Sequence, residues 1–263
     1  MIQFNIQRFG KLAKWTLVND KKYFIKSFLQ VFAILTFLFL FFTYVMSRES
    51  VRSSINAYET CSIAVVILFG VTCVVGSSFM FYSMDGKHDM QALLMLPASN
   101  FEKYLMRYAS WIILLPLYLV AFFAADLFQY VFGLVVGHEE VRFVASALVD
   151  MVGDTWHKIP ADKHTTIVLG ITLIAIWLHS VYALGANFFR FHKNNWIPTT
   201  LIIVFLTMVA IWLIPSNVGS GKDSSLLEDI VMDTLYAFFV GLNFWLSYRL
   251  FCRRQVIGKL INV

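Results

Sequence analysis

The stretch that decides how this chain is organised is residues 84–108, MDGKHDMQALLMLPASNFEKYLMRY. Residues 89–96 are rich in helix formers, and Pro97 should end that helix, because proline lacks an N–H and moves the preceding residue out of helical geometry. Ser99 then begins a second helix with Glu102 three residues later, which is the spacing of a capping box. We therefore predict a short helix, a break, and a capped helix that continues into the next apolar segment.

The composition is that of a membrane protein. Hydrophobic residues make up 59% of the 263 residues and charged residues 14%, whereas soluble domains carry about 25% charged residues. Six apolar stretches approach the length of about 20 residues that crosses a bilayer as a helix. The predicted spans are 28–46, 62–82, 111–136, 166–189, 196–215 and 230–251. We expect an all-α, polytopic fold with six transmembrane helices in a single domain, 1–263.

The segment before the first span is basic and has one apolar face. Residues 1–27 contain six Lys/Arg, and Phe9, Leu12, Ala13 and Thr16 recur at helical spacing. This pattern predicts an amphipathic interfacial helix on the cytoplasmic surface of the membrane, in contact with lipid. The alternative is an irregular basic tail that only sets the orientation of the chain.

Positive charge gathers on one side of the predicted topology. With six crossings, the two termini and the loops 83–110 and 190–195 share a side, and they hold 15 of the 21 Lys/Arg. The positive-inside rule places that side in the cytoplasm, so that 137–165 becomes an outer loop. Because topology accounts for the net charge of +5, we expect no binding to nucleic acid.

Residues 91–107, QALLMLPASNFEKYLMR, resemble a segment of the ATP-binding-cassette permeases of the type-two exporter class: a leucine-rich helix, then Pro-x-Ser, then a basic helix. The six spans and the N-terminal amphipathic helix are also similar to the plan of that family. The resemblance implies that 89–96 is a coupling helix that docks onto a separate ATPase subunit. It also implies a second permease copy or a paralogue, and location in the bacterial inner membrane. The residues assigned to coupling are Met90, Leu93, Leu94, Leu96, Pro97, Ser99 and Glu102.

One segment departs from the pattern of that family. Its members often have re-entrant helices between spans five and six, whereas the corresponding loop here, 216–229, is short. The resemblance therefore does not extend to any particular substrate.

The chain itself has no nucleotide-binding loop. Its Gly-Lys pairs, at 10–11, 86–87, 221–222 and 258–259, are not followed by the Ser or Thr that a P-loop requires. We therefore expect no enzyme activity and no cofactor on this chain, with ATP bound by the partner. Neither the cysteines, at 61, 73 and 252, nor the histidines and acids of 137–165 show the spacing of a metal site.

Polar side chains inside the predicted spans form the second candidate site. Such residues are costly in a bilayer and are functional candidates by default. They are Asp126, His179, Asn187 and Asn243. They could line a translocation path, or they could make buried hydrogen bonds between helices. Two other functions stay open: a non-transporting membrane scaffold or envelope sensor that responds through 137–165, and an intramembrane enzyme.

Overall fold

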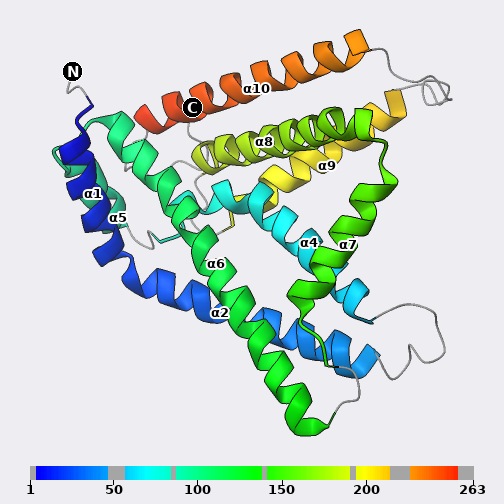
Figure 1. Ribbon diagram of the computed structural model, residues 1–263. Helices are drawn as coiled ribbons and strands as arrows, with labels where there is room; N and C mark the ends of the chain where they lie inside the picture. The colour runs from blue at the N-terminus through cyan, green and yellow to red at the C-terminus, as the bar shows by residue number, and fades with distance from the viewer. Residues whose placement is uncertain are drawn as a thin grey trace. The chain divides into compact units, whose positions relative to one another are not determined.

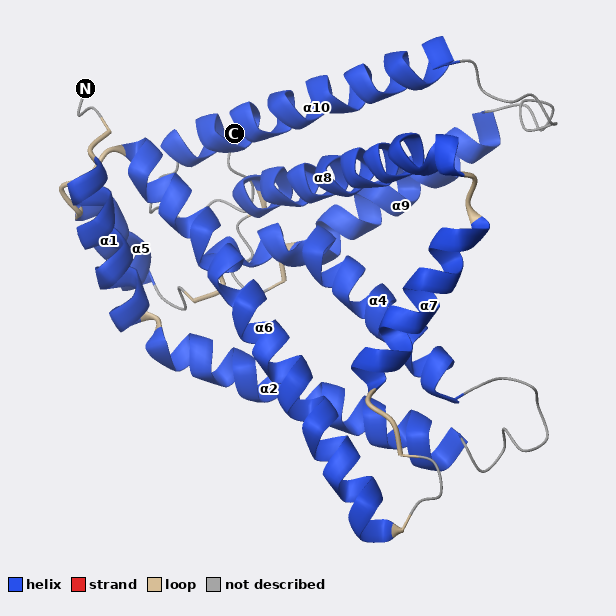
Figure 2. Cartoon of the chain, in the orientation of Figure 1, coloured by secondary structure: helices blue, strands red, loops and turns tan. Residues whose placement is uncertain are grey.

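The computed structural model describes residues 4–46, 57–83, 87–137, 141–189, 194–213 and 226–253. Regular structure in these ranges is helical throughout, and none of them contains a strand (Figure 2). The predicted all-α fold is therefore confirmed.

The helices are named in chain order in Figure 1. Two of them change their winding at the C-terminal end: α2 continues as a π-helix and α4 as a 3₁₀ helix. The elements are α1 Ile6–Asn19, α2 Lys21–Leu40 with η1 Phe41–Met46, α4 Ala57–Val75 with η2 Gly76–Phe81, α5 Lys87–Met95, α6 Asn100–Val136, α7 Val144–Lys158, η3 Ala161–Lys163, α8 His164–Phe188, α9 Trp196–Leu213 and α10 Leu226–Cys252.

Several helices have the length and composition of membrane spans. Among the residues that the structure describes, five segments are long and apolar enough to cross a bilayer: Lys21–Val45, Ala57–Phe81, Asn100–Val136, His164–Phe188 and Ile230–Cys252. The predicted fifth span falls on α9, whose apolar segment, Trp196–Val209, is shorter. The chain thus has the helices of a multi-pass membrane protein.

The N-terminal region differs from the prediction in two ways. Helix α1 ends at Asn19 and α2 begins at Lys21, so residues 21–27 belong to the first long apolar helix and not to the amphipathic one. In addition, Leu12 and Thr16, which lie on the predicted apolar face, are buried within the protein. That face therefore packs on the chain itself, where lipid contact was expected.

The segment predicted as an outer loop is largely helical. It contains α7 and the short helix η3. Val144, Ala147, Leu148 and Met151 recur at i, i+3, i+4 and i+7, which is the period of a helix with one apolar face. The sequence did not lead to a predicted helix here, because acidic residues lie between the apolar positions.

The described chain divides into two compact units. The first comprises Met1–Lys14, Cys73–Trp111 and His164–Val263, and the second Trp15–Thr72 and Ile112–Lys163. In the first unit α8 packs along α10 and also contacts η2 and α9. The three long helices α8, α9 and α10 run side by side in Figure 1. The core of the first unit consists of Met80, Phe81, Leu93, Tyr104, Ala186 and Phe251.

The second unit has a separate apolar core. It is built from α2, α4, the C-terminal part of α6 and α7. Its buried members are Leu35, Phe39, Tyr58, Cys61, Val65, Ala125, Val144 and Ala147. Helix α6 is continuous from Asn100 to Val136, so its first turns belong to one unit and the remainder to the other.

Candidate functional site

The candidate site is the corner between α5 and α6, residues 87–111, which we call the elbow. Helix α5 ends at Met95, and the N–H of Ala98 donates to the carbonyl oxygen of Leu96 at 2.8 Å in the turn that follows. The Ser99 N–H donates to Glu102 Oε2 at 2.8 Å, and the Glu102 N–H donates to Ser99 Oγ at 3.2 Å. This reciprocal pair is a capping box, so that prediction is confirmed.

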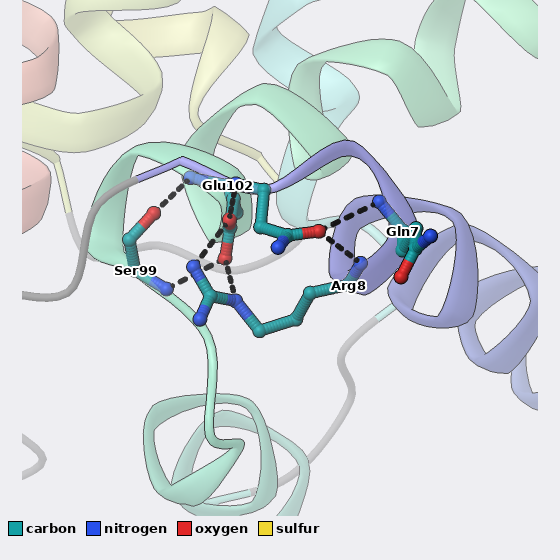
Figure 3. Close-up of polar contacts among 5 residues, drawn as sticks. Gln7, Arg8, Ser99 and Glu102 are labelled. Carbon is teal, nitrogen blue, oxygen red and sulfur yellow. Dashed lines mark hydrogen bonds and ion pairs between the residues drawn. The ribbon is translucent and has the colours of Figure 1, made fainter.

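Glu102 also attaches the N-terminal segment to the elbow. Its carboxylate accepts hydrogen bonds from the Asn5 N–H at 2.7 Å, from Arg8 Nε at 2.8 Å and from Arg8 Nη2 at 2.7 Å (Figure 3). With the Ser99 N–H, four donors share the two oxygens of a side chain that is 0% exposed. The first turn of α1 is thereby fixed to the first turn of α6.

The start of α1 is itself ordered by a local cap. Asn5 Oδ1 accepts the N–H groups of Gln7 at 2.9 Å and Arg8 at 3.3 Å. The side-chain hydrogen bond to Glu102 raises the pKa of the Arg8 guanidinium above its usual value. A guanidinium is charged at every physiological pH without this shift, and Nε and Nη2 of Arg8 hold the Glu102 carboxylate in a bidentate geometry.

Helix α5 has an anchored face and an exposed face. Leu93 is 0% exposed and lies in the core of the first unit, and Lys103 Nζ donates to the Leu94 carbonyl oxygen at 2.7 Å. Met95, in contrast, is 84% exposed. Gln91 and Ala92, three to four residues earlier in the helix, are exposed as well.

These positions redefine which predicted residues a partner could contact. Leu93 faces inward, Leu94 and Leu96 are half-buried, and Pro97 is exposed. The Met90 side chain lies outside the described residues. Sequence reasoning did not select Met95, because the apolar run from 93 to 96 does not show which member points outward.

His179 joins two parts of the first unit at the point where α4 changes to a 3₁₀ helix. Its Nδ1 lies 2.6 Å from the Cys73 carbonyl oxygen and its Nε2 lies 2.8 Å from Tyr108 Oη. A carbonyl oxygen only accepts, so Nδ1 carries a proton, and in the neutral ring Nε2 is then the acceptor for the Tyr108 hydroxyl. Ser77 Oγ donates in return to the His179 carbonyl oxygen at 2.7 Å.

A glycine makes this junction possible. The Trp111 indole lies over Gly76 so closely that any Cβ at this position would overlap it. Trp111 also lies against the His179 ring, with 5.1 Å between the centroids. Small size, and not backbone flexibility, is the property that Gly76 contributes.

Asn187 and Asn243 link α8 to α10 in the same unit. Asn187 Nδ2 donates to Ser247 Oγ at 2.9 Å, and Asn243 Nδ2 donates to Ser180 Oγ at 3.0 Å. Tyr104 of α6 donates to the same Ser247 oxygen at 3.1 Å. Hydrogen bonds of this kind hold membrane helices together, and lining a translocation path stays a prediction for both residues.

Asp126 lies in the second unit and performs a different task. Its Oδ1 accepts the Val144 N–H at 2.8 Å and its Oδ2 the Ala145 N–H at 3.0 Å, and the side chain is 1% exposed. Both donors are in the first turn of α7, which follows Phe143, a residue with no polar side chain to cap the helix. Asp126 therefore acts as the N-terminal cap of α7 from a distance.

Comparisons of the chain with known protein families, with characterised proteins and with solved structures find no match. Among the residues that the structure describes, no group of three or more His, Cys, Asp or Glu is placed to hold a metal ion. A functional interpretation therefore depends on the construction of the elbow and on the residues 91–107 themselves.

Proposed function

We propose that this chain is the membrane subunit of an exporter of the ATP-binding-cassette class, driven by a separate ATPase that docks on the exposed face of α5. The observation that carries the proposal is the elbow. A short surface helix has one face anchored in the core and the other exposed. It meets a 37-residue helix through a corner fixed by hydrogen bonds.

The elbow is built to pass a force from α5 to α6. Displacement of α5 is resisted by the buried Leu93 and by the bond from Lys103 to the Leu94 carbonyl. Glu102 fixes the start of α6 to the turn and to Arg8. At about 1.5 Å per residue α6 is about 55 Å long, which exceeds the hydrocarbon thickness of about 30 Å. The helix can therefore reach from a surface partner across the bilayer.

The proposed cycle has two states. The ATPase closes on ATP and moves α5, the elbow tilts α6, and a cavity between this subunit and a second copy or paralogue opens to the other side. In this proposal α9 supplies a sixth span and both termini face the cytoplasm of a bacterial cell. Polar residues in the spans of each unit are the candidates for lining the path. Those residues are Asp126, His179, Asn187 and Asn243.

Co-purification with an exposed-face variant tests the proposal. The tagged chain is isolated in mild detergent, partners are identified by mass spectrometry, and ATP hydrolysis of the complex is measured. Met95→Asp should release an ATPase that the wild type and Met95→Leu retain, because it places a charge in the apolar contact. Val18→Asp on α1 is the matched control, since Val18 is 70% exposed and is not one of the elbow residues 87–111.

The result that would overturn the proposal is a wild-type preparation without any P-loop ATPase under conditions that keep the chain folded. The non-transporting scaffold or sensor would then be the better interpretation. Retention of the ATPase by Met95→Asp would instead move the contact away from α5. Leu93→Asp does not serve as a test, because a buried charge at this position would unfold the elbow.

A further inference from the structure

The segment after α6 turns back alongside that helix. Gly137 has φ +73°, in the left-handed region where glycine is favoured, and it follows the last residue of α6. The Phe143 ring stacks on Tyr130 with 4.1 Å between the centroids, and Val141 lies against Gly133. Residues 141–143 therefore run antiparallel to the last turns of α6.

Because residues 141–143 run back along α6, the first turn of α7 lies beside Asp126 and not at the C-terminal end of α6. Asp126 caps α7 through Val144 and Ala145, and it lies ten residues before the end of α6. At about 1.5 Å per residue, that places the first turn of α7 about 15 Å below the C-terminal end of α6. The α6 surface over this length is apolar and exposed, as at Leu134 and Val135.

Helix α7 has three faces. The inner face, with Val144 and Ala147, lies in the core of the second unit. At 100° per residue a second apolar stripe, Val149, Val152 and Trp156, lies about a third of a turn away, and its members are exposed. The remaining third is polar and exposed: Ser146, Asp150, Asp154 and His157.

We propose that α7 lies in the membrane surface, with the stripe Val149, Val152 and Trp156 in contact with lipid acyl chains of the leaflet that the C-terminal end of α6 reaches. A soluble helix hides one apolar face, whereas α7 has a second one directed away from the protein. Its polar third faces water, and Trp156 has the amphipathic ring that favours the membrane interface.

The helices before and after α7 also favour lipid as the partner of the stripe. Helix α6, which ends at Val136, precedes it and α8, which starts at His164, follows it, and both helices have the length and composition of membrane spans. The stripe is thus connected on both sides to helices with the length and composition of membrane spans. The proposal concerns this segment alone and holds whether or not the chain is a transporter subunit.

Site-directed spin labelling in lipid nanodiscs tests the proposal. Single cysteines replace Val149, Val152 and Trp156 on the stripe and Asp150, Asp154 and His157 on the polar face, in a chain with Cys73→Ala and Cys252→Ala. The unsubstituted background shows how much label reaches the buried Cys61. Collisions with oxygen, which concentrates in lipid, and with a water-soluble nickel chelate are compared at each position.

The expected result is that the ratio of oxygen to nickel collisions follows the faces of the helix. Collisions with oxygen should dominate at the three stripe positions, and collisions with the nickel chelate at the three polar positions. Strong nickel collisions at all six positions would overturn the proposal, because α7 would then stand in water. Weak collisions of both reagents at the stripe would also overturn it, because protein would cover that face. Amide exchange of 144–158 is also measured in the unlabelled wild type. Slow exchange there would show that the helix exists without the label.

Discussion

Two buried carboxylates in this chain have the same task and obtain their partners in opposite ways. Glu102 receives the N–H of Ser99, three residues before it, at the start of its own helix. Asp126 receives the N–H of Val144, 18 residues after it, at the start of another helix. The helix start that is capped locally was visible in the sequence, whereas the start that is capped from a distance was not. A carboxylate in an apolar span can therefore be structural, and only its partner shows it.

Removal of the remote cap should have the largest effect. Asp126→Ala leaves two N–H groups of α7 without an acceptor, and an unsatisfied buried group costs about 1–3 kcal/mol. Because the Ala145 N–H is only part-buried, we expect a total loss of about 2–4 kcal/mol. The free energy of unfolding is measured by SDS titration in mixed micelles, with amide exchange of 144–147 alongside. Asp126→Asn keeps one acceptor oxygen, so its free energy of unfolding should lie between those of the wild type and Asp126→Ala. Unchanged exchange at 144–147 in the alanine variant would show that α7 does not depend on this cap.

Removal of the local carboxylate should have a smaller effect. Glu102→Ala frees several donors, but the Arg8 side chain is 30% exposed and water can replace part of its hydrogen bonding, so we expect a loss of about 1–3 kcal/mol. Amide exchange should rise in both 5–9 and 99–102. Arg8→Ala is the informative partner variant, because it should raise exchange in 5–9 alone and leave the capping box. If Arg8→Ala raised the amide-exchange rate equally in 5–9 and in 99–102, α1 and the elbow would open together.

The capping serine should contribute less again. Ser99→Ala removes the acceptor of the Glu102 N–H and should cost about 1 kcal/mol, whereas Ser99→Asp should keep most of the stability, since aspartate is an equally good cap. The Ser99→Ala/Glu102→Ala double variant should lose less than the sum of the single losses, because both residues belong to one capping box. Strict additivity in the same SDS titration would contradict the reciprocal geometry.

The smallest effect is expected at the surface of α7. Arg142 Nη2 pairs with Asp150 at 2.9 Å, but both side chains are about half exposed or more, and such pairs contribute about 0.2–1 kcal/mol. Arg142→Ala should therefore leave amide exchange at 144–147 close to that of the wild type. A loss as large as that of Asp126→Ala would show that the ion pair, and not the cap, holds α7.

The sequence by itself determined the elements that depend on neighbouring residues. Proline at 97 ended α5, Ser99 and Glu102 began α6, and apolar runs of about 20 residues marked the long helices. These features follow from contacts within about four residues or from composition, which a single sequence contains in full. The helical period of α7 was present as well, and the acidic residues between its apolar positions concealed it.

Only the tertiary structure decided which side of each element faces inward and which distant residue it meets. It buried Leu93 and exposed Met95, brought Arg8 to Glu102, and placed Asp126 at the start of α7. Leucine and methionine are both apolar, and a carboxylate can accept any N–H within reach, so residue type alone does not choose among these partners. The choice is made by packing, which brings together segments that are far apart along the chain.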